Sequence, residues 1–213
     1  MSLSVDEAEH SIEMQLPYVY KMMSGYLLSN NQHCQASSDC CSITPLNALP
    51  PVVPILVGNT SPETEKKYGA LLSPYLADPE NAFVISSDFC HWGSRFRYTY
   101  YEPDGGPPTS LRSSDAAPSS PPIHASIRKV DMACMQAIES GKHDDFLQVL
   151  NETGNTVCGR HPIGIIMAGL EELQKTTGNE KSTFTFVQYA RSSDCSSPRD
   201  SSVSYASAFV VVD

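Results

Sequence analysis

Residues 86–93 (SSDFCHWG) contain the side chains best suited to chemistry. Asp88 and His91 are three residues apart, so a turn or a helical backbone would place them on one face. A carboxylate and an imidazole at the end of a strand can hold a metal ion or act as an acid–base pair. The same spacing fits a structural alternative, in which Asp88 caps a turn and His91 is an ordinary hydrogen-bonded histidine.

A second candidate is Cys195, in the small-residue segment RSSDCSS that follows the apolar run FTFVQYA. A thiolate is a soft ligand for copper, iron or zinc, and it is also open to oxidation. The structural alternative is a loop cysteine without a chemical role.

Three weaker candidates remain. The segment CGRHP (158–162) places Arg160 and His161 at the expected start of a helix, where an anion is favoured. Cys158 and His161 resemble half of a zinc site, but no matching pair follows at zinc-finger spacing. His10, near the N-terminus, fits an acidic helix start. Arg97, in the basic and aromatic run RFRYTYY, fits either an anion-binding residue or a loop anchor.

The elements that must position these residues alternate between helix and strand. Helices are expected at 11–23, 62–75, 123–140, 142–150 and 162–175, and strands at 52–57, 82–86, 182–189 and 202–212. This order predicts an α/β fold with a central, mostly parallel sheet flanked by helices. In such sheets the pocket lies beyond the carboxyl ends of the strands. Segments at about 29–51 and 102–122 are polar, so we expect flexible insertions in a single domain over 1–213.

The bulk composition narrows the class of partner. The chain has 213 residues, with 14 Lys plus Arg against 24 Asp plus Glu and a net charge of −10. This excess of acid argues against nucleic acid and anionic membranes as partners. No apolar run approaches the ~20 residues of a bilayer span, and the start lacks a signal-peptide pattern. We therefore expect a protein of the cytosol or nucleus, with its odd number of cysteines as free thiols.

Several segments together resemble the Memo family. These are EHSIEMQLPY (9–18), PILVG (54–58), YLADP (75–79), VISSDFCHWG (84–93), RFRY (95–98), CGRHPIG (158–164) and DSSVSYA (200–206). The resemblance covers almost all of the chain outside the two insertions, and seven motifs in order are far more specific than any one of them.

The resemblance implies a fold like that of the class III extradiol ring-cleaving dioxygenases and a pocket that binds copper or iron. By motif, Asp88, His91 and Cys195 would line this pocket as metal ligands, and Phe186 would be its aromatic residue. His10, Arg97, Arg160 and His161 are further candidates for the pocket. Family members also carry an N-terminal region with two metal-binding histidines, and nothing in this chain matches those motifs. We therefore expect a fold incomplete at its N-terminus and weaker metal binding.

Three functions remain open at this point. The first is a metal-binding redox protein with a role in cell-motility signalling, in which His91 and Asp88 would also be the residues of catalysis. The second is a non-catalytic adaptor that binds a phosphotyrosine or other anionic peptide in the same pocket. The third, a ring-cleaving dioxygenase, ranks last because it needs the upstream histidines.

Overall fold

The structure, a computed structural model, describes residues 10–30, 49–178 and 182–212. The chain divides into two compact units, Met1–Leu56 and Val57–Asp213. In the first unit the described residues form the 3-10 helix η1 (Glu13–Gln15) and the helix α2 (Leu16–Asn30). Pro17 lies in the first turn of α2, where a missing N–H costs no helical hydrogen bond. Most of the insertion expected at 29–51 falls outside the described residues.

The second unit contains the four helices that the sequence predicts there. They are α3 (Pro62–Leu76), α4 (Ile123–Glu139), α5 (His143–Thr153) and α6 (Arg160–Thr177). The local signals act as expected at their ends. The Ser61 hydroxyl accepts the N–H of Thr64 at 3.3 Å and caps α3. Gly154 and Gly178, both with positive φ, end α5 and α6.

The strands of the second unit pair in an antiparallel direction. The main sheet has the order β1-β5-β4, formed by β1 (His91–Trp92), β5 (Ser202–Phe209) and β4 (Thr185–Arg191). A short hairpin joins β2 (Tyr100–Tyr101) to β3 (Thr109–Ser110), so the insertion expected at 102–122 contains the hairpin loop and its second strand. The α/β class is thus confirmed, but the prediction of a mostly parallel sheet is wrong. The connection between β4 and β5 is too short to contain the crossover that parallel neighbours need.

Two apolar runs expected to be buried strands are not strands. Residues 52–57 and 82–86 have no regular secondary structure, and no described strand pairs with either of them. Several of their side chains are exposed, with Val53 at 77% and Val84 at 57%. The composition of these runs favours a strand, but a strand also needs a hydrogen-bonded neighbour, which is a non-local requirement.

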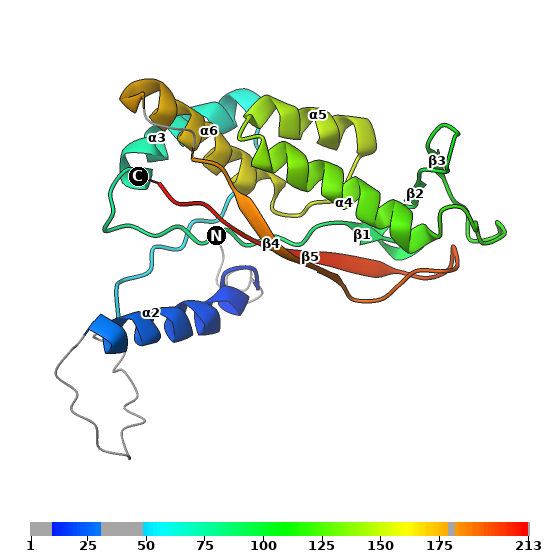
Figure 1. The fold of residues 1–213 in the computed structure, drawn as a ribbon, viewed down its shortest axis with the longest axis horizontal. Helices are drawn as coiled ribbons and strands as arrows, with labels where there is room; N and C mark the ends of the chain where they lie inside the picture. The colour runs from blue at the N-terminus through cyan, green and yellow to red at the C-terminus, as the bar shows by residue number, and fades with distance from the viewer. Residues whose placement is uncertain (1–9, 31–48, 179–181, 213) are drawn as a thin grey trace, which may run out of the picture. The chain divides into compact units, whose positions relative to one another are not determined.

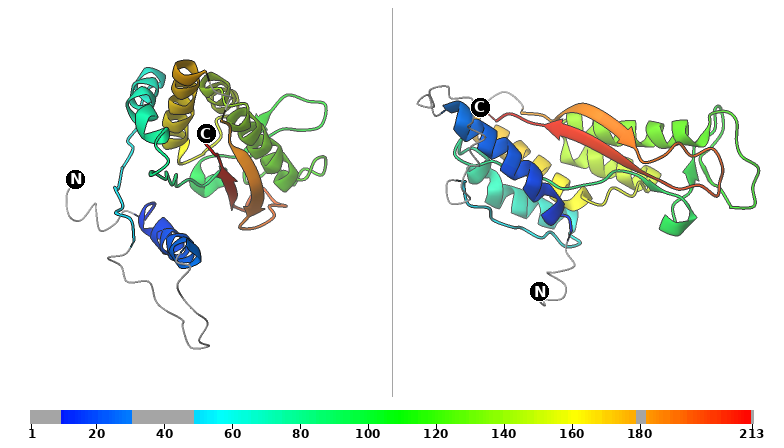
Figure 2. Two further views of the ribbon diagram at one scale, coloured as in Figure 1. Left: turned by 60° about the vertical axis from the view of Figure 1, so that its left-hand side comes forward. Right: turned by 90° about the horizontal axis from the view of Figure 1, so that it is seen from below.

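In Figures 1 and 2 the helices of the second unit lie to one side of β4 and β5, and the core of this unit contains side chains from both the helices and the strands. Phe89, Phe146, Val157, Ile166 and Met167 are among its buried members. The other face of β4 and β5 carries exposed apolar side chains, namely Val187, Tyr205, Phe209 and, just beyond β5, Val211. Of the helices in the described part of the chain, none is long and apolar enough to cross a membrane.

Candidate functional site

Hydrogen bonds to the surrounding backbone hold the His91 ring in one orientation. Its Nδ1 atom lies 3.0 Å from the carbonyl oxygen of Phe89 and 3.2 Å from that of Thr156. Carbonyl oxygens only accept hydrogen bonds, so Nδ1 carries a proton, and Nε2 is the ring nitrogen left for another partner. The Thr156 hydroxyl also accepts the His91 backbone N–H at 2.7 Å. This is the arrangement by which proteins orient a metal-binding histidine.

Asp88 faces the free nitrogen of His91. Its Oδ2 atom lies 3.7 Å from His91 Nε2, and the two side chains are 43% and 23% exposed. This separation is too long for a direct hydrogen bond. Two ligands of one metal ion, with bonds of about 2.0–2.2 Å, can lie at such a distance. The pair therefore fits two donors of an accessible metal site.

The His91 ring also packs against an aromatic side chain. Phe96 meets it edge-on, with ring centroids 5.2 Å apart, and the Arg95 guanidinium lies 4.4 Å from the Phe96 ring centroid. The sequence segment RFRY thus supports the imidazole through Phe96, a role that sequence reasoning did not assign to it.

Cys195 occupies a different environment. Its side chain is fully buried in a cluster with Cys90, Trp92, Tyr101, Ile123 and Ile127. Burial raises the pKa of its thiol to about 11, so the thiolate is scarce at neutral pH. Within the described ranges, no three histidine, cysteine, aspartate or glutamate side chains are close enough to hold one ion. Asp88 and His91 are thus a two-donor arrangement, and the membership of Cys195 stays a prediction.

The thiol that lies beside Asp88 is that of Cys158. The Asp88 backbone N–H donates to Cys158 Sγ at 3.0 Å, and the Cys158 backbone N–H donates to the Asp88 carbonyl at 3.3 Å. Cys158 is exposed, unlike Cys195. The sequence did not predict that Cys158 and Thr156 lie close to the Asp88–His91 pair. Both come from a segment about 70 residues further along the chain, and no local pattern signals the contact.

The remaining predicted pocket residues lie in several places. Phe186 is on β4 and packs edge-on against Phe89, with centroids 5.7 Å apart, so it contacts the neighbour of Asp88. Arg97 is exposed and ends a 3-10 helix, η3 (Ser94–Phe96), with a left-handed backbone of φ 58°. Arg160 is exposed at the first position of α6, next to His161. His10 is an exposed residue of the first unit.

His161 is bound to a buried carboxylate, Glu65, that the sequence motifs did not single out. Its Nδ1 lies 2.6 Å from Oε1 of Glu65, and Nε2 of His143 lies 2.7 Å from Oε2 of the same carboxylate. Glu65 is only 1% exposed. The Glu65 cluster (Glu65, His143 and His161) is therefore a buried polar centre that the sequence motifs did not reveal.

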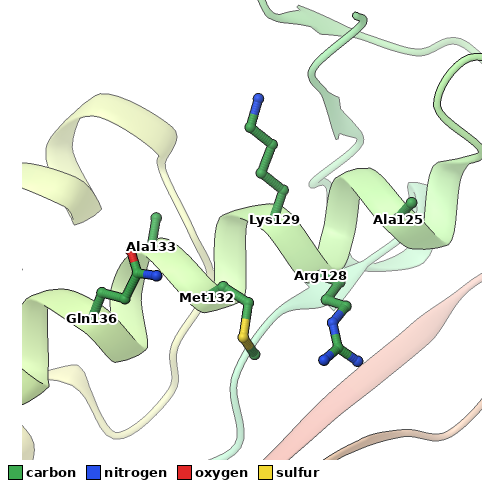
Figure 3. A pocket seen from close by; sticks show the side chains of 6 residues that line it. All are labelled: Ala125, Arg128, Lys129, Met132, Ala133 and Gln136. Atoms are coloured by element: carbon green, nitrogen blue, oxygen red, sulfur yellow. The ribbon is translucent and has the colours of Figure 1, made fainter.

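A shallow surface depression runs along α4 and is lined by Ala125, Arg128, Lys129, Met132, Ala133 and Gln136. Figure 3 shows the long side chains of Arg128 and Lys129 leaving the helix in different directions. Both cations have partners, since Arg128 lies over the Tyr189 ring and Lys129 pairs with Glu102. None of the predicted site residues lines this depression.

Comparison with known proteins agrees with the sequence motifs. The sequence model of the family described as "Memo-like protein" matches residues 1–209. "Protein MEMO1" of Xenopus tropicalis is 44% identical over 212 residues, which cover 100% of this chain and 59% of the frog protein. The human "Protein MEMO1" is 42% identical over the same shares. "MEMO1 family protein C4H3.04c" of Schizosaccharomyces pombe is 39% identical over 98% of this chain and 61% of its own length. The chain thus spans about three fifths of the curated relatives that it matches, and it belongs to the Memo-like protein family.

Proposed function

We propose that this chain is a metal-binding protein of the Memo-like family, with Asp88 and His91 as two ligands for a copper or iron ion. The observation that carries the proposal is the state of His91. Its Nδ1 proton is engaged by two carbonyl oxygens, and its Nε2 atom faces a partly exposed carboxylate. Such an imidazole is prepared to bind a metal ion without any change of tautomer.

Two donors bind a first-row transition metal weakly, because a tight site uses three or more well-placed ligands. The described residues supply only this pair at one point. The proposed metal site therefore needs further donors. Cys195 stays our candidate from the family resemblance, although the structure does not gather it with Asp88 and His91 into one group of ligands. Bound copper or iron would supply one-electron redox chemistry there, and the contribution of this chain is to orient the imidazole and the carboxylate.

The proposal is tested by titrating the protein with Cu²⁺, and with Fe²⁺ under anaerobic conditions, followed by calorimetry. We expect Asp88→Asn and His91→Gln each to weaken binding by about tenfold or more, in keeping with losses seen when metal-site residues are changed. Cys195→Ser should also lower metal retention if the thiol joins the site.

A matched control is Glu172→Gln. Glu172 pairs with Lys175 at 3.7 Å, the same separation as between Asp88 and His91, and its side chain is 38% exposed. The control removes one surface carboxylate without touching the pair, so its affinity should equal that of the wild type. Equal affinities for the wild type, Asp88→Asn and His91→Gln would refute the assignment.

A second function, the binding of an anionic peptide such as a phosphotyrosine segment, is favoured by two arginines. Arg97 and Arg160 are both exposed, and no salt bridge between described residues involves either of them. A guanidinium without a carboxylate partner is suited to phosphate. This function would connect the chain to motility signalling in the cytosol, as we expect from its family.

Fluorescence anisotropy with a labelled phosphotyrosine peptide tests this second function. Arg97→Gln or Arg160→Gln should weaken binding, whereas Arg112→Gln, at another exposed arginine, should leave it unchanged. A peptide affinity that is the same in all three variants and the wild type would rule out a role for these arginines.

A further inference from the structure

The starts of three helices meet at one buried carboxylate, Glu65. Glu65 itself lies in the first turn of α3, His143 is the first residue of α5, and His161 is the second residue of α6. Glu65 Oε2 lies 2.7 Å from His143 Nε2, and Oε1 lies 2.6 Å from His161 Nδ1. The Thr60 hydroxyl also donates to Oε1 at 3.1 Å. The Glu65 cluster thus ties together elements that are far apart in sequence.

His143 is enclosed and faces carboxylates from both ring nitrogens. The residue is 0% exposed. Its Nε2 faces Glu65, and its Nδ1 lies 3.4 Å from Oδ1 of Asp144. Ionised carboxylates only accept hydrogen bonds, so a neutral imidazole leaves one lone pair against a carboxylate oxygen. The imidazolium satisfies both contacts and also neutralises the buried charge of Glu65.

The other charged groups around His143 lie on α3, α5 and α6, the helices that pack around it. On α3, Lys66 pairs with Asp144 at 2.7 Å and opposes a positive charge on His143, and Glu63 lies one turn away from Lys66. On α5, the next carboxylate is Asp145, which pairs with Lys142. On α6, Oε1 of Glu171 accepts the His143 backbone N–H at 2.7 Å, and His161 shares Glu65. The partial positive charges at the starts of α5 and α6 also oppose the imidazolium.

Glu65 and His143 are closely packed, and His161 is the partly exposed member of the Glu65 cluster, at 14%. A Cβ atom at Gly164 would lie 2.6 Å from Oε2 of Glu65, so the carboxylate rests directly against the α6 backbone. Further along the same helices, a Cβ at Gly69 would lie 2.6 Å from the backbone nitrogen of Gly169. Because Glu65 and His143 are buried, loss of the His143 proton would leave the Glu65 charge with little solvent to stabilise it.

We propose that His143 is a protonation-dependent clamp, which holds the starts of α3, α5 and α6 on Glu65 as an imidazolium and loosens them when it loses its proton. This inference goes beyond the proposed metal function and uses none of its residues.

The direction of the pH dependence follows from the surroundings of the ring. Burial lowers the pKa of His143, but the hydrogen bonds to Glu65 and Asp144 outweigh it, so the net pKa is raised above the ordinary value of 6.5. The stabilisation is therefore complete below about pH 6.5 and is lost as the pH rises through the folded-state pKa. Because only one proton is involved, the folding equilibrium constant changes by at most tenfold for each pH unit between about pH 6.5 and the folded-state pKa.

Urea unfolding of the full chain between pH 5 and 9 tests the clamp, together with ¹⁵N NMR of the histidine rings. We expect the folding equilibrium constant of the wild type to fall by up to tenfold per pH unit above about pH 6.5. His143→Gln keeps a donor toward Glu65 but cannot titrate, so it should lack this component. His10→Gln, at an exposed histidine of the first unit, should keep it.

The NMR measurement decides the question even if His143→Gln does not fold. Both ring nitrogens of His143 in the wild type should show imidazolium shifts at pH 6.5, and Glu65→Gln should lower the pH at which they change. A neutral His143 at pH 6, or the same pH dependence in the wild type and His143→Gln, would overturn the proposal.

Discussion

The Tyr189 hydroxyl on β4 donates a hydrogen bond of 2.8 Å to Oδ2 of Asp131, a carboxyl group on α4 with no exposed surface. The other oxygen, Oδ1, accepts the Cys90 backbone N–H at 3.1 Å and the Asn155 side-chain amide at 3.0 Å. One buried carboxyl therefore joins α4 to β4, to the segment that leads into β1 and to the residues just after α5.

Replacing this carboxyl should destabilise the protein although the side-chain shape is kept. Asp131→Asn turns one acceptor oxygen into a donor that faces other donors, and we expect a loss of about 1–3 kcal/mol in the free energy of unfolding. Tyr189→Phe removes the hydroxyl contacts to Asp131 and, at 3.2 Å, to the Ser204 hydroxyl, and should cost about 1–2 kcal/mol. Urea denaturation measures both values. A stability of Asp131→Asn equal to that of the wild type would show that the four elements are held by apolar packing alone.

The close approach of α3 and α6 should make Gly69 intolerant of a methyl group. A Cβ there would lie 2.6 Å from Gly169 N and 2.8 Å from the Ala168 Cβ. Separating the helices to fit it should cost about 1–3 kcal/mol of unfolding free energy. Gly25 on α2 offers the matched control, because a Cβ there meets nothing within 4 Å. Gly25→Ala should instead raise the helix content seen by far-UV circular dichroism. Equal, small effects of both changes would contradict the close contact.

The four cysteines of the described residues should differ sharply in reactivity. Cys158 is exposed, whereas Cys90, Cys134 and Cys195 are buried. Burial also raises the pKa of Cys195 to about 11 and that of Cys134 to about 12, which leaves little thiolate at neutral pH. Under native conditions iodoacetamide should therefore modify Cys158 first, as mapped by peptide mass spectrometry. Urea should remove the difference, and early native labelling of Cys195 would indicate an accessible pocket at that residue.

Low pH should also weaken the Glu65 cluster, because it protonates the Glu65 carboxylate. Burial raises the pKa of Glu65, but hydrogen bonds from His143, His161 and Thr60 outweigh it, so the net pKa lies below the ordinary 4.5. A lowered carboxyl pKa gives stability that is present above about pH 4.5 and is lost as the pH falls through the folded-state value. The urea midpoint of the wild type should drop in that range, and Glu65→Gln should show a smaller drop. Glu172→Gln, at a surface carboxylate, should behave like the wild type.

The sequence was most informative where structure is decided locally. The four helices of the second unit follow from nearby residues, and they were predicted, although α5 continues past the expected 150 to Thr153, before Gly154. Strand direction was predicted wrongly, because it depends on which segments pair. The run 82–86 has the composition of a buried strand, yet it has no described neighbour to complete its hydrogen bonds.

The same distinction applies to the candidate site. Asp88 and His91 were predicted as a pair because they are three positions apart in the sequence. In the structure, Asp88 Oδ2 lies 3.7 Å from His91 Nε2. Thr156 and Cys158, which contact them, come from a distant segment and left no periodic or motif signal. Glu65 looked like an ordinary helix-start acid, and only the tertiary fold shows that two imidazoles converge on it.

The apolar outer face of β4 and β5 has a practical consequence for handling the protein. Phe209 is 52% exposed and Val211 is 63% exposed, beside Val187 and Tyr205 on the same two strands or just beyond them. An exposed apolar patch of this kind binds hydrophobic dyes such as anilinonaphthalene sulfonate. It also promotes aggregation as the protein concentration rises. Folded protein should therefore give dye fluorescence before any denaturant is added, and a charged replacement such as Val187→Lys should reduce both the signal and the turbidity of concentrated samples.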